Sequence, residues 1–145
     1  MKFAEFYPGQ VITLGPVSLS ERQIIDFARQ HDPQWFHTDP EAAARSRWGG
    51  LIASGWHTCA LAMRLACDGV LAGSESIGSP GVAYLKWPAP VRPNEPLTLR
   101  IELLEVRRSE RRPELGIVRW RWRLQHADGP DALELEATSL FELPA

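Results

Sequence analysis

The sequence contains only two cysteines, Cys59 and Cys67, among its 145 residues. They lie eight positions apart in one apolar stretch, and no CxxC pair occurs. This scarcity excludes a disulfide framework and a cysteine-rich zinc site. We interpret both as small core residues of a protein that folds in a reducing cytoplasm.

Long hydrophobic runs and an excess of one charge are also missing. No apolar segment approaches the roughly 18 residues of a membrane helix, and the N-terminus lacks the apolar core of a secretory signal. Sixteen Lys and Arg residues against eighteen Asp and Glu residues give a net charge of −2. This balance disfavours a dedicated nucleic-acid-binding protein. We therefore expect a cytoplasmic protein whose partners include neither membrane nor nucleic acid.

Several catalytic motifs are absent as well. The chain has no GxSxG, P-loop, GxGxxG or HExxH motif, which disfavours a serine hydrolase, an NTPase, a dinucleotide enzyme and a zincin. His31, His37 and Asp39 could be imagined as metal ligands, but no further ligand cluster accompanies them. We therefore expect chemistry that uses no metal and no cofactor.

The length and composition of the chain are those of one globular domain, residues 1–145. Hydrophobic residues make up 44% and charged residues 23% of the sequence, both ordinary values. A chain of this size can bury one core. It leaves little room for a deep pocket in addition to that core.

The first half of the chain predicts a short strand over 11–14 followed by helices. Ser18 and Glu21 have the spacing of a capping box, so a helix should run to about Gln30. Its buried stripe would consist of Ile24, Ile25, Phe27 and Ala28. A second short helix should start at Asp39 and Pro40. From Gly55 to about Leu71 the sequence predicts a helix that is apolar on most faces and therefore buried.

The second half changes to a period of two, which is typical of antiparallel strands covered on one face. The expected strands lie around 81–87, 97–103, 118–124 and 133–141, and the last three should form a meander because only polar turns separate them. The fold class is therefore α+β, an antiparallel sheet wrapped around one long helix. Arg119, Arg121 and Arg123 occupy a polar strand face that is either solvated or phosphate-binding.

Asp32 and His37 are the polar residues most suited to chemistry. They lie in an irregular segment next to Trp35 and Phe36. A carboxylate and an imidazole in an apolar setting can share a water and transfer protons at neutral pH. Alternatively, Asp32 caps a turn and His37 is a half-buried histidine with a structural hydrogen bond.

Gly55 lies where the long helix should begin. The first N–H groups of a helix have no internal partners and point out at the positive end of its dipole. Such a group can bind a developing oxyanion, and a glycine would let a substrate approach the backbone closely. Alternatively, Gly55 merely turns the chain.

Together these residues resemble the MaoC-like dehydratase family, also called the R-specific enoyl-CoA hydratases. The segment 32–43 resembles the family's aspartate–histidine signature with its acidic residue and alanine-rich turn. The segments 47–50 and 52–55 resemble its aromatic-glycine step and its Ile-Ala-x-Gly entry to the central helix. A third match is 84–95, which resembles the strand and Pro-Val-Arg-Pro-Gly-Asp turn of the family.

The resemblance implies a hot-dog fold and a homodimer with the active site at the subunit interface. It implies reversible, metal-free hydration of a 2-enoyl-CoA, or of an acyl carrier protein thioester, to the (R)-3-hydroxyacyl form. Asp32 and His37 would hold the water, and the N–H of Gly55 would bind the thioester oxygen in an oxyanion hole. Candidate substrate-binding residues are Trp35, Phe36, Trp48, Ser54, Trp56 and His57.

The sequence departs from the family pattern at several positions. The serine that often supports the aspartate, five residues after the helix glycine, is Ala60 here, so the support for Asp32 must differ. Ser54 replaces the usual histidine before the glycine. His57 either contributes a polar group to the acyl tunnel or bonds to a neighbour. Trp35, Trp48 and Trp56 predict a restricted or aromatic-lined acyl pocket.

Two other functions stay open at this stage. A hot-dog thioesterase usually carries a Glu or Asp on the central helix, but the chain has no carboxylate between Gly55 and Leu65, and Asp68 comes late. A non-catalytic acyl-CoA-binding module would keep the fold without the chemistry, and the intact Asp32–His37 pair argues against it.

Overall fold

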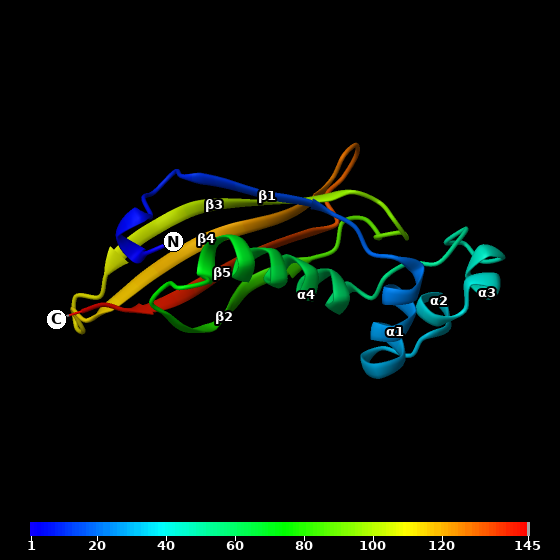
Figure 1. The fold of residues 1–145 in the computed structure, drawn as a ribbon, viewed down its shortest axis with the longest axis horizontal. Helices are drawn as coiled ribbons and strands as arrows, with labels where there is room; N and C mark the ends of the chain where they lie inside the picture. The colour runs from blue at the N-terminus through cyan, green and yellow to red at the C-terminus, as the bar shows by residue number, and fades with distance from the viewer. Residues whose placement is uncertain (145) are drawn as a thin grey trace.

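A computed structural model describes residues 1–144 as one antiparallel sheet with a helix along one face (Figure 1). Three further helices lie beyond the end of the sheet, at the N-terminal end of the helix that follows the sheet (Figure 1). The helices are α1 (Glu21–His31), α2 (Trp35–Thr38), α3 (Pro40–Ala44) and α4 (Gly55–Ala66). The strands are β1 (Val11–Val17), β2 (Ser76–Lys86), β3 (Leu97–Arg108), β4 (Leu115–His126) and β5 (Leu133–Glu142). A 3₁₀ turn covers Phe3–Glu5.

The sheet has the strand order β1-β3-β4-β5-β2, with β1 and β2 at its edges. The predicted meander is confirmed, because β3 pairs with β4 and β4 with β5 in antiparallel register. Alternate residues of β3 are buried from Leu97 to Leu103, and the same alternation continues along β4. The period of two in the sequence therefore identifies the face that packs on α4.

The cap of α1 differs from the predicted one. Ser20, not Ser18, is the N-cap: its hydroxyl accepts a hydrogen bond from Gln23 N, and the Gln23 side chain accepts one from Ser20 N. The capping box predicted at Ser18 and Glu21 therefore forms two residues later, at Ser20 and Gln23. Ser18 cannot be the N-cap because it directly follows the last residue of β1, Val17. Ile24 and Ala28 of the predicted stripe are fully buried.

Helix α4 starts at Gly55 as predicted and continues into a π-helical turn, Cys67–Leu71. Thr58, Ala62 and Ala66 face the sheet and are buried. The side of α4 that is turned toward β2 stays open within one chain, with 61% of Trp56 and 42% of Met63 exposed. The prediction of a helix buried on most faces is therefore wrong for the single chain, because the sheet covers only one side.

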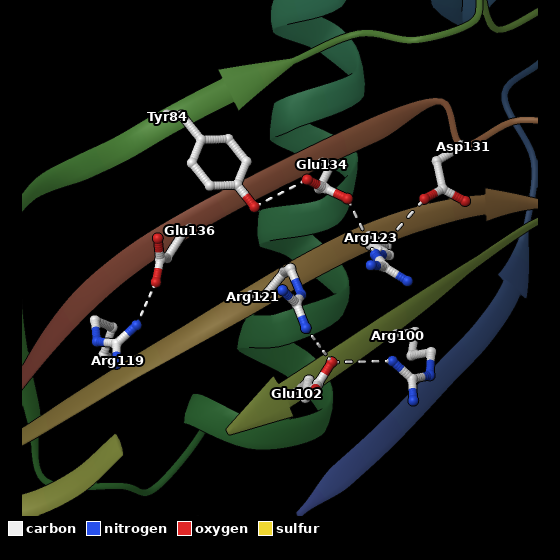
Figure 2. A network of polar contacts seen from close by, with 9 residues as sticks. All are labelled: Tyr84, Arg100, Glu102, Arg119, Arg121, Arg123, Asp131, Glu134 and Glu136. Atoms are coloured by element: carbon white, nitrogen blue, oxygen red, sulfur yellow. Dashed lines mark hydrogen bonds and ion pairs between the residues drawn. The ribbon is translucent and has the colours of Figure 1, made fainter. Parts of the chain in front are cut away.

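The arginine-rich face of the sheet lies opposite α4 and is an ion-pair network (Figure 2). Arg119 pairs with Glu105 and Glu136, Arg121 with Glu102, and Arg123 with Glu134 and Asp131. Since carboxylates from the neighbouring strands neutralise these guanidinium groups, the structure favours a solvated, self-paired face over a phosphate-binding one.

None of the helices formed by residues 1–144 is both long and apolar enough to cross a membrane.

Candidate active site

Asp32 and His37 are brought together by the turn that joins α1 to α2. Asp32 is the C-cap of α1, which ends there because Pro33 follows. Residues 35–38, for which the sequence predicted irregular structure, form the short helix α2, and this places His37 back over Asp32. His37 Nε2 lies 3.2 Å from Asp32 Oδ2. The turn between α1 and α2 therefore brings the Asp32 carboxylate and the His37 imidazole, five residues apart in the sequence, into direct contact.

The His37 ring is held in one orientation from its other side. Its Nδ1 lies 2.7 Å from the carbonyl oxygen of Ile52. Because a carbonyl oxygen can only accept, Nδ1 carries the hydrogen and donates it. The side chain is 5% exposed, so this bond also satisfies a buried donor. Nε2 is consequently the nitrogen that is free to exchange a proton beside Asp32.

Two neutral side chains donate hydrogen bonds to the Asp32 carboxylate. Ser54 Oγ donates to Oδ2 at 2.7 Å and Gln34 Nε2 donates to Oδ1 at 2.7 Å. Partial burial of Asp32 acts to raise its pKa, but these two bonds and the His37 imidazole outweigh it and hold the pKa below its usual value. Asp32 is therefore ionised at neutral pH. Ser54 provides the support for the aspartate that Ala60 does not supply.

The N-terminus of α4 lies beside this pair. Gly55 N–H donates to no acceptor within residues 1–144, as expected for the first residue of a helix. The indole of Trp87 packs on Gly55, and its Nε1 donates to Gly55 O at 3.0 Å. A Cβ at position 55 would lie only 2.5 Å from Trp87 Cε2. The glycine is thus required by the Trp87 ring as well as by any ligand at its N–H.

A cleft of about 400 Å³ joins these groups. The predicted residues that line it are Asp32, His37, Gly55, Phe36, Trp48 and Trp56. The other three lie elsewhere: Trp35 is 49% exposed, Ser54 is fully buried behind Asp32, and His57 stacks on Phe27 with ring centroids 4.3 Å apart. Stacking on α1 turns the His57 ring away from the cleft, although its Nδ1 has no partner among the described residues.

Several further residues line the cleft, although the sequence predicted no role in binding for any of them. They are Ile52, Ala53, Thr58, Trp87, Pro88, Ala89, Pro90 and Val91. The last five follow β2 and reach the cleft because Val91 O accepts a hydrogen bond from Ala53 N at 2.8 Å. The Pro-rich segment was visible in the sequence, but its approach to α4 is a tertiary contact that no local pattern encodes.

The combined geometry supplies two elements of acyl-thioester chemistry. An ionised carboxylate and an imidazole with one exchangeable nitrogen can orient a water and take its proton. A backbone N–H at a helix start in the same cleft can polarise a carbonyl oxygen. Within residues 1–144, no three or more His, Cys, Asp or Glu side chains gather as a potential metal site.

Comparison with known proteins identifies relatives of the whole chain. Residues 4–119 match the MaoC like domain family. The uncharacterized protein YdeM of Bacillus subtilis is 34% identical over 118 residues, which cover 81% of this chain and 82% of YdeM.

Solved structures share the fold. The MaoC-like dehydratase of Rhodospirillum rubrum superposes with a TM-score of 0.87 at 34% identity, covering 98% of this chain and 97% of that one. The R-hydratase PhaJ1 of Pseudomonas aeruginosa gives 0.78 at 24% identity, covering 98% and 86%. These likenesses confirm the predicted hot-dog fold. Since the family match spans most of the sequence and a relative at 34% identity spans nearly all of it, the chain belongs to the MaoC-like dehydratase family.

Proposed function

We propose that this protein, a hydratase/dehydratase by family, catalyses the reversible addition of water to a 2-enoyl-CoA. The product is the (R)-3-hydroxyacyl-CoA, and an acyl carrier protein is the alternative carrier of the thioester. The observation that carries the proposal is the 3.2 Å contact between His37 Nε2 and Asp32 Oδ2 in the same cleft as the unpaired N–H of Gly55.

The thioester oxygen of the substrate binds at the N–H of Gly55. As water adds to C3, negative charge builds on this oxygen in an enolate-like transition state. The positive end of the α4 dipole and the N–H stabilise that charge more than they stabilise the neutral carbonyl. A stronger interaction in the transition state than in the ground state is what raises the rate.

The water binds beside the 3.2 Å contact, where it reaches both the Asp32 carboxylate and His37 Nε2. The pair takes one proton from the water while the oxygen forms its bond to C3, and C2 receives a proton on the same face. The Asp32–His37 pair passes the proton that it took from the water on to C2, so the hydroxyl ends on C3, the hydrogen on C2, and the enzyme returns to its starting state. The Nδ1 hydrogen bond to Ile52 O holds His37 in the tautomer with Nε2 available, and Ser54 keeps Asp32 ionised.

The first prediction tests the pair itself by the loss of the conjugated thioester absorbance of crotonyl-CoA. Asp32→Asn and His37→Ala should each lower kcat/KM by about 10²–10⁴-fold, the usual contribution of a general acid–base group. Asp26→Asn and His31→Ala are matched controls, because Asp26 pairs with Arg22 on the exposed side of α1 and His31 is exposed. Near-wild-type turnover by either Asp32→Asn or His37→Ala, with the fold intact by circular dichroism, would refute the assignment.

We also propose that the working enzyme is a homodimer whose two sheets join. β2 lies at the edge of the sheet and is exposed along most of its length, including Ile77 and Val82. An exposed apolar edge strand is a template for pairing with a second chain. The open side of α4, with Trp56 and Met63, adjoins this edge and would be covered by the same partner.

A thioesterase is the alternative that the same substrate class allows. Asp68, the first carboxylate after the start of α4, is exposed and pairs with Arg64 at 2.9 Å, which disfavours it as a nucleophile or base. Release of free thiol from acyl-CoA without loss of a double bond would favour the thioesterase. Absence of both reactions across chain lengths would indicate a module that only binds acyl-CoA.

A further inference from the structure

A second cavity of about 510 Å³ lies between α4 and the sheet. Its volume is within the range of roughly 300–1,000 Å³ that is typical of small-molecule sites. Its walls are mostly apolar: Cys59, Ala60 and Met63 come from α4, and Trp120, Trp122 and Leu135 come from β4 and β5. No ionisable Asp, Glu, Lys, Arg or His side chain lines it among residues 1–144. The cavity is therefore suited to a hydrocarbon group.

Trp56 separates this cavity from the catalytic cleft. It is the one residue within 1–144 that lines both spaces. Its ring meets the Trp87 indole edge to face, with centroids 5.2 Å apart, and Trp87 in turn packs on Gly55. The Trp56 side chain, which follows Gly55 in the sequence, thus lies next to the proposed oxyanion position and borders the apolar cavity.

We infer that Trp56 is the specificity-determining residue of this enzyme and that the second cavity takes the distal part of the acyl chain. The inference rests on the proposed function, since it assumes that the thioester oxygen binds at Gly55. A short enoyl group fits the catalytic cleft alone. A longer group extends past Trp56, so its binding requires the indole to move off Trp87. The native substrate class is accordingly a short-chain enoyl thioester, and the size of residue 56 sets the limit.

Removal of the indole should open the route into the cavity. Each methylene that becomes buried contributes about a fourfold gain in binding, so a chain several carbons longer than crotonyl has much to gain. Trp56 is 61% exposed within one chain, so a substitution there leaves the core of that chain intact, and light scattering verifies that each variant keeps the proposed dimer. The observable is therefore the ratio of kcat/KM for 2-decenoyl-CoA to kcat/KM for crotonyl-CoA.

The test compares this ratio in the wild-type protein, Trp56→Phe and Trp56→Ala. We expect it to rise at least about tenfold in Trp56→Ala and by an intermediate amount in Trp56→Phe. Tyr7→Ala is the matched control for the loss of an exposed aromatic ring, since Tyr7 is 59% exposed and lines neither space. A ratio unchanged within twofold in both Trp56 variants would overturn the inference, as would a parallel loss with both substrates.

A second substitution tests the path behind the indole. Met63 lines only the second cavity, so Met63→Trp narrows that cavity. In the double variant, Met63→Trp should cancel most of the gain that Trp56→Ala gives in the ratio of kcat/KM for 2-decenoyl-CoA to that for crotonyl-CoA. In the protein that keeps Trp56, Met63→Trp should change this ratio far less. Additive effects of the two substitutions would contradict the route.

The proposed function and this inference fail differently. If the wild-type protein hydrates neither thioester, the proposed function is wrong. If it hydrates crotonyl-CoA and the ratio does not respond to residue 56, only the role of Trp56 is wrong.

Discussion

At the scale of single residues, the site depends on how the Asp32 carboxylate is supported. Ser54 donates to Oδ2, the oxygen that also contacts His37, whereas Gln34 donates to Oδ1. Ser54 is fully buried, and Gln34 is exposed to water that can replace its bond. Both bonds lower the pKa of Asp32, but water cannot replace the buried Ser54 bond when it is lost.

We predict that Ser54→Ala lowers kcat/KM for crotonyl-CoA hydration and shifts the acid limb of its pH profile to higher pH. Loss of a hydrogen bond to a charged group costs about 1.5–3 kcal/mol, or roughly 10–100-fold in rate. Because that bond lowers the pKa of Asp32, its removal raises the pKa, and the fall in kcat/KM at acid pH should begin at a higher pH. The pH profile of crotonyl-CoA hydration measures both effects. Gln34→Ala should give a smaller change in the same direction, and a larger change than Ser54→Ala would refute this ranking.

At the scale of elements, helix starts and strand faces had clear signals in the sequence. Asp39 caps α3 through Ala42 N with Pro40 in the first turn, as predicted. The alternation along β3 and β4 identified their buried face. The cap of α1 was misplaced by two residues because Ser18 and Ser20 both offer a hydroxyl, and only the extent of β1 distinguishes them.

The two serines provide a matched test of this cap. Ser20→Ala should reduce the free energy of unfolding by about 1 kcal/mol, the usual contribution of an N-cap side chain. Ser18→Ala should change it much less, since α1 begins after Ser20. Urea unfolding at one fixed protein concentration compares the two variants. Equal losses would show that Ser20 has no special role in starting the helix.

At the scale of the whole molecule, the short chain leaves two surfaces for a partner. The exposed edge of β2 and the open side of α4 both carry apolar side chains that a second copy would cover. In the proposed dimer, the pocket that a chain of this length has little room to enclose would be completed between two copies.

The oligomeric state at assay concentration tests this arrangement. We expect a single species of twice the 16.3 kDa chain mass by light scattering, and activity per chain should fall where dilution dissociates it. A monomer with full activity at the same concentration would exclude the shared site.

Local patterns in the sequence were sufficient to predict the helix starts at Asp39 and Gly55 and the meander of the last three strands, whereas the assignment of the Asp32–His37 pair depended on the family resemblance. Hydrogen bonds within a helical turn and the alternation along a strand act between near neighbours, so residue order encodes them. The contacts of Ser54 with Asp32, Trp87 with Gly55 and His37 with Ile52 O join residues 15 to 32 positions apart. Such contacts depend on how the segment after β2 and the turn after α1 pack against the start of α4. For this reason the support of the aspartate and the position of Trp56 between two cavities became visible only in the folded chain.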